Sequence, residues 1–288
     1  MRVPDNRAVG VFDSGLGGLT AVRELTRLLP REEIVYFGDT ARVPYGTRSR
    51  ETILSYMRQD IAFLMTFDIK ALVVACGTAS TAGLPLLERD YDFPVVGVVE
   101  PAARAAAAAT RNGRVGLIGT EAAVGSGAYE RALRQIAPGL SVRAQACPLL
   151  VPLVENGRGR RGDRVAELVV AEYTDPLRAA GIDTLILGCT HYPLLRDIIA
   201  DAMGSGVALI DAGREVARRV SEILAEGDAL AGRAAPGPGR YFVSDSVEGF
   251  ARRAALFCPE AINGRVEKVE IDSTTNAFIL PAKNGKNC

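Results

Sequence analysis

The chain lacks tryptophan altogether and has a single histidine among its 288 residues. It also lacks net charge, because 34 basic residues balance 34 acidic ones, and this argues against nucleic acid or a membrane surface as a partner. Its five cysteines, an odd number in a chain this long, do not form the pattern of a disulfide framework. We therefore expect a protein of the reducing cytoplasm.

Long hydrophobic runs are absent as well. The longest uncharged stretch, residues 71–87, is interrupted by Gly77, Gly83 and Pro85, so it does not predict a membrane span. The first eight residues, MRVPDNRA, contain no apolar region of the kind that marks export. Because 48% of the residues are nevertheless hydrophobic, the chain is able to bury a substantial core.

Short apolar runs rich in Val, Ile and Leu recur along the chain. They lie at residues 9–13, 33–38, 71–76, 95–99, 115–119, 184–189 and 207–211. Since they are nearly continuous rather than alternating, they are typical of strands covered on both faces. Apolar residues at helical spacing predict helices over 19–29, over 49–65 behind a Ser49 cap, and over 101–110 with Pro101 at the first helical position. This alternation predicts an α/β fold with mostly parallel sheets.

Two pairs of segments match each other within the chain. VGVFDS at 9–14 resembles VGLIGT at 115–120, and VVACGT at 73–78 resembles LILGCT at 185–190. The matches predict two halves with one plan, in which an early strand ends in small polar residues and a later strand ends in cysteine and threonine. A linker over 225–240 and a final strand–helix–strand unit then complete the chain.

Polar side chains gather where the predicted strands end, which is where ligands bind in open parallel sheets. They are Asp13, Ser14, Cys76, Thr78, Thr120, Cys189, Thr190 and His191. A single cysteine is more often a small buried hydrophobe, but two cysteines that each stand beside a threonine at a strand end favour a functional pair. The lone histidine, two residues from Cys189, is placed to govern the proton of that thiol. Cys147 and Cys258 lack polar neighbours and are interpreted as structural, and Cys288 as an exposed tail thiol.

Other readings of these residues remain open at this point. A zinc site built from Cys76, Cys189 and His191 is disfavoured because the chain has neither a C-x-x-C pair nor H-x-x-x-H. The glycine-rich stretch at 13–18 is suited to anion binding at a helix start, or it is simply a tight turn. The loop at 38–46 is either a connector or a source of backbone donors at its end.

Seven blocks between about residue 9 and residue 211 form a recognisable series. In order they read VFDSGLGGLT, YFGDTARVPYGTRS, VVACGTAS, GVVEPAARAA, IGTEAAVGSGAY, ACPLLVPLVENG and LILGCTHYPLL. With these blocks the chain resembles the glutamate racemase family. The resemblance implies two pseudo-symmetric, doubly wound α/β domains with mostly parallel sheets and the active site in the cleft between them. On this chain they would be residues 1–98 with 210–288, and residues 99–209.

The resemblance also implies an activity and its residues. The family interconverts L- and D-glutamate without a cofactor or metal, supplies D-glutamate for peptidoglycan, and suggests a homodimer. Cys76 is expected to be the base for D-glutamate, assisted by Asp13. Cys189 is expected to be the base for L-glutamate, with Glu155 and His191 near it. The expected substrate-binding positions are Asp13, Ser14, Pro44, Tyr45, Gly46, Gly77, Thr78, Thr120, Thr190 and His191.

One position departs from the family pattern. Members usually carry asparagine where this chain has Gly77, so a polar contact with the amino acid is missing. We expect weaker turnover or a shifted substrate preference relative to an asparagine version. The departure keeps two alternatives open: a racemase for another amino acid such as aspartate, and a ligand-binding relative with weakened catalysis. A metal or redox protein is a third, less favoured reading.

Overall fold

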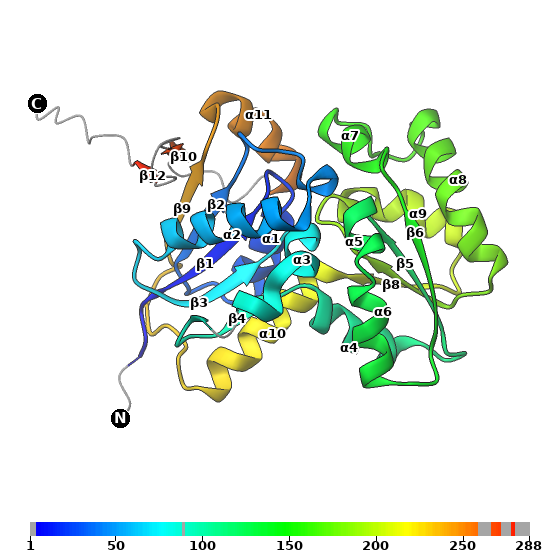
Figure 1. Ribbon diagram of the computed structural model, residues 1–288, viewed down its shortest axis with the longest axis horizontal. Coiled ribbons are helices and arrows are strands. Elements are labelled where there is room, and N and C mark those ends of the chain that lie inside the picture. The colour runs from blue at the N-terminus through cyan, green and yellow to red at the C-terminus, as the bar shows by residue number, and fades with distance from the viewer. Residues whose placement is uncertain (1–3, 88–89, 259–265, 272–277, 280–288) are drawn as a thin grey trace, which may run out of the picture.

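Two parallel β-sheets form the framework of the protein (Figure 1). The computed structural model describes residues 4–87, 90–258, 266–271 and 278–279, so Cys288 lies outside the described residues. The first sheet has the order β10-β9-β2-β1-β3-β4. Its strands are β1 (Ala8–Asp13), β2 (Ile34–Gly38), β3 (Ile69–Val74), β4 (Val95–Gly97), β9 (Gly239–Val243) and β10 (Val266–Lys268). A short antiparallel pair, β11 (Glu270–Ile271) and β12 (Phe278–Ile279), lies apart from it.

The second sheet has the order β6-β5-β7-β8 and is also parallel throughout. Its strands are β5 (Arg114–Gly119), β6 (Ser141–Ala146), β7 (Thr184–Leu187) and β8 (Ala208–Asp211). The helices are α1 (Leu19–Leu28), α2 (Arg50–Leu64), α3 (Gly77–Leu87), α4 (Val99–Ala109), α5 (Glu121–Gly125), α6 (Ala128–Ile136), α7 (Leu150–Glu155), α8 (Arg164–Ala179), α9 (Arg196–Met203), α10 (Ala212–Glu226) and α11 (Val247–Phe257), with short 3₁₀ turns η1 (Tyr45–Thr47) and η3 (Tyr192–Leu195). None of the described helices is long and apolar enough to cross a membrane.

The two sheets repeat one strand order. The run β2-β1-β3-β4 of the first sheet corresponds to β6-β5-β7-β8 of the second, so β1 matches β5 and β3 matches β7. These are the strands that carry the matched sequence segments. Cys76 follows the end of β3 by two residues, and Cys189 follows the end of β7 by two residues. The internal match in the sequence therefore corresponds to equivalent positions in the two sheets.

The predicted α/β fold with mostly parallel sheets is confirmed, and each predicted apolar run contains a strand. Helix α2 begins behind Ser49, whose Oγ accepts the Thr52 N–H at 3.3 Å. The prediction that Pro101 opens a helix is wrong by two residues, because α4 begins at Val99. Strand β6 was not predicted, because it is an edge strand whose side chains are at most partly buried. The proposed domain limits stay a prediction.

The apolar core passes through both sheets. One continuous cluster of buried side chains includes Val11 of β1 and Leu117 of β5, and a second lies on the opposite face of the first sheet around Phe12 and Leu72. Burial of each such side chain contributes about 1.5–3 kcal/mol. Helix α10 follows β8 of the second sheet but packs on α1 beside the first, where Figure 1 shows it in yellow. Packing thus joins the two sheets into one framework.

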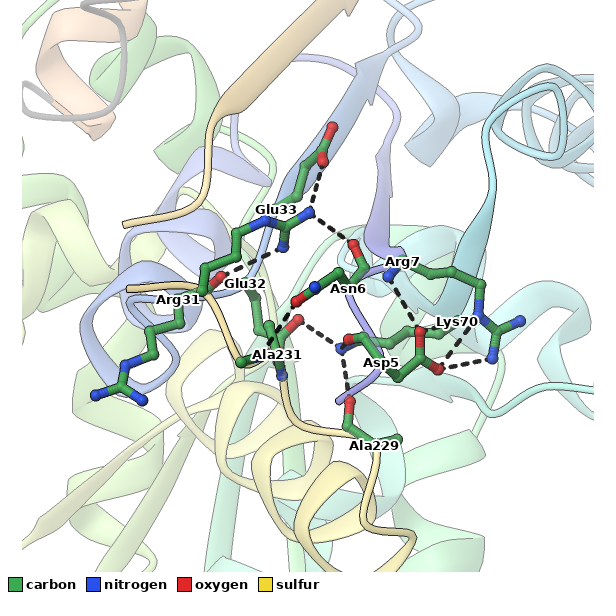
Figure 2. Close-up of polar contacts among 11 residues, drawn as sticks. Asp5, Asn6, Arg7, Arg31, Glu32, Glu33, Lys70, Ala229 and Ala231 are labelled. Carbon is green, nitrogen blue, oxygen red and sulfur yellow. Dashed lines mark hydrogen bonds and ion pairs between the residues drawn. The ribbon is translucent and has the colours of Figure 1, made fainter. Parts of the chain in front are cut away.

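A buried ion pair ties together the amino ends of the first sheet's strands (Figure 2). The Nζ of Lys70 lies 2.7 Å from Oε2 of Glu32 and donates to the carbonyl oxygens of Asp5 and Ala229, both at 2.6 Å. The other carboxylate oxygen of Glu32 accepts the Ala231 N–H at 2.8 Å. The ammonium therefore holds three separate segments at the end of the sheet opposite the cysteines.

Removal of this cation should destabilise the fold strongly. Lys70→Met leaves the Glu32 carboxylate buried without its counter-charge, and we expect the free energy of unfolding in urea to fall by about 3–5 kcal/mol. The control is Arg161→Met, which removes an exposed partner of Asp201 and should change stability little. Equal and small effects of the two substitutions would contradict a structural role for Lys70.

Candidate active site

A cavity of about 400 Å³ opens where the carboxyl ends of the two sheets' strands meet. Twelve of the thirteen residues selected from the sequence line it, from both sheets. They are Ser14, Pro44, Tyr45, Gly46, Cys76, Gly77, Thr78, Thr120, Glu155, Cys189, Thr190 and His191. Asp13 does not line the cavity, because it lies at the end of β1 with only 1% of its surface exposed. Both strand-end cysteines therefore face one space.

The Cys76 thiol sits at the amino end of α3. Its Sγ lies 3.2 Å from Oγ of Ser14 and accepts the Ala79 N–H at 3.4 Å. Burial and the nearby charge of Asp13 raise the pKa of Cys76 to about 12, although these two hydrogen bonds oppose the change. At neutral pH this thiol is consequently protonated.

Asp13 acts on Cys76 through its charge rather than by direct contact. Oδ2 of Asp13 accepts the Gly15 N–H at 2.9 Å, while Ser14 provides the side chain next to the sulfur. Burial raises the pKa of Asp13, and the positive charge of His191 partly offsets that rise. The Asp13 carboxyl group is thus buried next to the cavity without lining it. Its expected contact with the substrate stays a prediction.

The Cys189 thiol has a different partner. Nδ1 of His191 lies 3.9 Å from Sγ of Cys189, and Nε2 lies 3.0 Å from Oε1 of Glu155. Burial alone lowers the pKa of His191, but the hydrogen bonds with Cys189 and Glu155 outweigh it and raise the pKa to about 10. The same bond to His191 lowers the pKa of Glu155, against the effect of burial. The imidazole is therefore a cation at neutral pH, held between a carboxylate and a sulfur atom.

Hydrogen bonds cross between the two sheets beside the cavity. Oγ1 of Thr78 lies 2.9 Å from Oγ1 of Thr120, which also caps α5 by accepting the Ala123 N–H at 3.2 Å. Oγ1 of Thr20 donates to the carbonyl oxygen of Thr190 at 3.0 Å. These contacts hold the loops after β1 and β3 against those after β5 and β7.

Several residues near the site were not predicted from the sequence. The ring of Phe257 meets the His191 imidazole edge-on at 5.1 Å between centroids, and Arg253 lies 3.9 Å from Glu155. Both belong to α11, far along the chain. Cys147, interpreted as structural, lines the cavity, but its thiol donates to the carbonyl oxygen of Gln145 at 3.5 Å. Their positions beside the site depend on tertiary contacts, which the local sequence pattern does not predict.

A charged network lies behind the cavity wall formed by Tyr45. The Tyr45 hydroxyl lies 2.5 Å from Oδ2 of Asp39 and 2.8 Å from Oδ2 of Asp60. The guanidinium of Arg42 donates to both carboxyl groups at 2.6 Å and stacks over the ring of Tyr56. Burial, together with the charge of Asp39, raises the pKa of Asp60 well above its ordinary value. The network thus places two buried carboxyl groups around one cation, and the raised pKa of Asp60 means that this group gives up its proton less readily than an ordinary carboxyl group.

The zinc reading does not fit this arrangement. Among the residues that the structure describes, no three His, Cys, Asp or Glu side chains are grouped so that they could hold a metal ion. The two thiols instead have separate neighbours, Ser14 for Cys76 and His191 for Cys189.

Comparison with known proteins agrees with a site of this kind. A family model described as Asp/Glu/Hydantoin racemase matches residues 16–220. The chain belongs to this racemase family. Membership makes the protein an isomerase. The two thiols that follow matched strands, Cys76 and Cys189, line its cavity.

The racemase relatives match almost the whole chain. A glutamate racemase of Geobacter metallireducens is 51% identical over 246 residues, covering 85% of this chain and 90% of the relative. The crystal structure of a glutamate racemase isoform from Bacillus anthracis has a TM-score of 0.85 at 40% identity and covers 93% of this chain and 98% of that one. The glutamate racemase of Francisella tularensis in complex with D-glutamate has a TM-score of 0.86 at 35% identity, covering 93% and 99%. The resemblance found in the sequence is confirmed.

The network behind Tyr45 yields a stability prediction for this racemase. Asp60→Asn keeps the shape of a protonated carboxyl group and should change the free energy of unfolding at pH 7 by no more than about 1 kcal/mol. Arg42→Met leaves the buried carboxyl groups without their cation and should cost about 3–5 kcal/mol. Urea unfolding of both variants measures the difference.

The pH dependence provides the control. Since the folded-state pKa of Asp60 is raised above the ordinary 3.8, the unfolded chain loses this proton more readily, and wild type should lose stability relative to Asp60→Asn as the pH rises above 3.8. A large loss in Asp60→Asn at neutral pH would show that the carboxyl group is ionised in the folded protein.

Proposed function

We propose that the protein interconverts L- and D-glutamate, with Cys76 and Cys189 as acid and base on opposite faces of the substrate's α-carbon. The observation that carries this proposal is that both thiols line one cavity of about 400 Å³, a volume suited to a single small molecule. The glutamate racemases that the chain resembles support the choice of substrate.

Thiols suit a reaction that must run in both directions. Inversion of a stereocentre by proton transfer needs a base on one face and an acid on the other, and the roles exchange after each turnover. Aspartate is too weak a base for this task, and lysine stays protonated at neutral pH. A thiol lies between them. Two residues of one chemical type, one ionised and one protonated, therefore match the chemistry.

Each sulfur has a defined part in each direction. From L-glutamate, the Cys189 thiolate removes the α-proton and the Cys76 thiol delivers a proton to the opposite face. From D-glutamate the two parts are reversed. His191 lies beside Cys189, with its Nδ1 3.9 Å from Sγ, and is the cation that faces this sulfur when Cys189 acts as the base.

The developing carbanion must be stabilised by the protein's own donors. Gly77 and Thr78, whose N–H groups at the start of α3 have no partner within the helix, both line the cavity. With the hydroxyls of Ser14 and Thr190 they form a set of donors for the substrate's α-carboxylate. A cavity closed to water strengthens each of these contacts.

The wider setting belongs to the same proposal. We infer that the enzyme works without cofactor or metal in the cytoplasm, supplies D-glutamate for peptidoglycan, and forms a homodimer, as the family resemblance implies. The substrate is proposed as glutamate rather than aspartate because the relatives that cover most of this chain are glutamate racemases.

The central test is incubation with L-glutamate in D₂O with a chelator and no pyridoxal phosphate. Wild type should racemise the substrate, seen by circular dichroism, and place deuterium on the α-carbon, seen by mass. Cys76→Ser and Cys189→Ser should each lower kcat by about 10²–10⁴-fold, because a serine hydroxyl is a far poorer base than a thiolate.

Cys147→Ser is the matched control, since this third cysteine lines the same cavity but donates its proton to a backbone carbonyl. It should keep most of the activity. Racemisation that survives in the Cys76→Ser, Cys189→Ser double variant would refute the two-thiol mechanism.

His191 should affect the two directions unequally. In His191→Asn the Cys189 thiol loses its cationic neighbour, so kcat at saturating L-glutamate should fall at least about tenfold more than kcat at saturating D-glutamate. The two KM values should shift by the same ratio, because kcat/KM stays equal in the two directions for a pair of enantiomers. Chiral analysis of initial rates measures both directions.

Stability offers an independent readout of the same charge. Because the folded-state pKa of about 10 lies above the ordinary 6.5, the stabilisation from protonated His191 is complete below pH 6.5 and is lost as the pH rises through 10. The stability gap between wild type and His191→Asn should shrink over that range. In the kinetic test, an equal loss of kcat from L-glutamate and from D-glutamate would contradict the assignment of His191 to Cys189.

A further inference from the structure

The two cysteine-bearing segments touch through a glycine. Gly77 directly follows Cys76, and Gly188 directly precedes Cys189. A Cβ atom placed on Gly77 would lie well inside 3.0 Å of the carbonyl oxygen of Gly188, closer than real Cβ contacts allow. Gly77 begins helix α3 and does not have a positive φ, so space rather than backbone conformation requires glycine here.

Hydrogen bonds fix the backbone segment that contains the Gly188 carbonyl oxygen. The Gly188 N–H donates to the carbonyl oxygen of Ile118 at 2.8 Å, and a Cβ on Gly188 would in turn lie 2.8 Å from that same oxygen. The carbonyl oxygen of Cys189 accepts the Tyr192 N–H at 3.1 Å, and that of Thr190 accepts from Thr20. Because the blocking atom is backbone in a bonded segment, it cannot turn aside as a flexible side chain does.

A second glycine makes a similar approach from another loop. A Cβ on Gly17, in the loop after β1, would overlap Oγ1 of Thr190 and lie 2.6 Å from Nδ1 of His191. The segment that carries Cys189 thus lies between the loop after β1 and the start of α3, and each of them meets it at a glycine. The contact that Gly77 makes is the nearer to both sulfur atoms along the chain.

We propose that Gly77 is a positioning residue that sets the spacing of the two thiols across the substrate. Lacking a Cβ, it allows the segment after Cys76 to pack directly on the backbone before Cys189. Any larger residue forces these segments apart, on the order of 1 Å, and a misplacement of that size is enough to cost a reaction about 100-fold in rate. This inference rests on the proposed two-thiol racemisation.

The inference reverses the effect expected for asparagine at this position. From the family pattern alone, the amide would supply a missing substrate contact and raise turnover. In this chain the Cβ of an asparagine would overlap the Gly188 carbonyl oxygen. The asparagine amide is therefore accommodated in the cavity only if the two thiols move apart. We expect Gly77→Asn to lose turnover, as Gly77→Ala does.

The test compares Gly77→Ala and Gly77→Asn with wild type on D-glutamate in D₂O. Both variants should lower kcat by about 10–100-fold and change KM by less than about threefold, because the ground-state donors remain. A second readout is deuterium in recovered D-glutamate relative to deuterium in L-glutamate. When the far thiol is out of reach, the carbanion persists until the Cys76 thiol, which carries the removed proton, exchanges it with D₂O and returns deuterium to the same face. This ratio should therefore rise several-fold.

Gly125→Ala is the matched control, because Gly125 lies in helix α5 with nothing within 4 Å of an added Cβ. It should leave kcat and the deuterium ratio unchanged. If Gly77→Ala does not fold, Gly17→Ala tests the same spacing from the other loop, and the same rise in the ratio is expected.

The outcomes separate this inference from the proposed function. An inactive wild type would refute the racemisation itself. With an active wild type, an unchanged kcat in Gly77→Ala, a gain in Gly77→Asn, or equal losses of inversion and same-face exchange would overturn the positioning role of Gly77.

Discussion

In the proposed racemisation, proton transfer through one carbon atom requires two sulfur atoms to be held at a fixed separation, and the contacts between the two sheets provide for this. Cys76 and Cys189 come from different sheets, each two residues beyond the end of an equivalent strand. Neither sheet is able to set their spacing alone. The contacts between the sheets do so, through the approach of Gly77 to Gly188 and the hydrogen bond between Thr78 and Thr120. The packing of the helices and sheets holds the residues of those contacts in position.

The shared strand plan supplies equivalent thiols, but their surroundings differ. Cys76 has the Ser14 hydroxyl and the buried charge of Asp13 nearby, which together with burial leave its pKa at about 12. Cys189 has His191, kept cationic by Glu155. The two halves therefore offer one chemical group in two electrostatic settings. This explains why a chain with one histidine places it in only one of two otherwise matched segments.

The sequence predicts those features that depend on local pattern. Continuous Val, Ile and Leu runs indicate buried parallel strands, and ligands gather at their carboxyl ends. This pattern predicts seven residues of the cavity: Ser14, Cys76, Thr78, Thr120, Cys189, Thr190 and His191. The assignments of Pro44, Gly77 and Glu155 came from the family resemblance. Strand β6 was not, because an edge strand with half-exposed side chains lacks that pattern. Arg253, Phe257 and the contact of Gly77 with Gly188 were not predictable either, since each depends on how distant segments pack. A motif gives the type of residue at a site but not the space around it.

The charge balance of the cavity links binding to chemistry. With a pKa of about 12, Cys76 is protonated at neutral pH, which suits its proposed part as the acid but not as the base. An opposite charge within about 4–6 Å favours the ionised form of such a group. An amino acid brings that charge as its ammonium, and it enters a buried space in which the interaction is screened little by water. In the proposed mechanism, this ammonium is the charge that would favour the base form of Cys76.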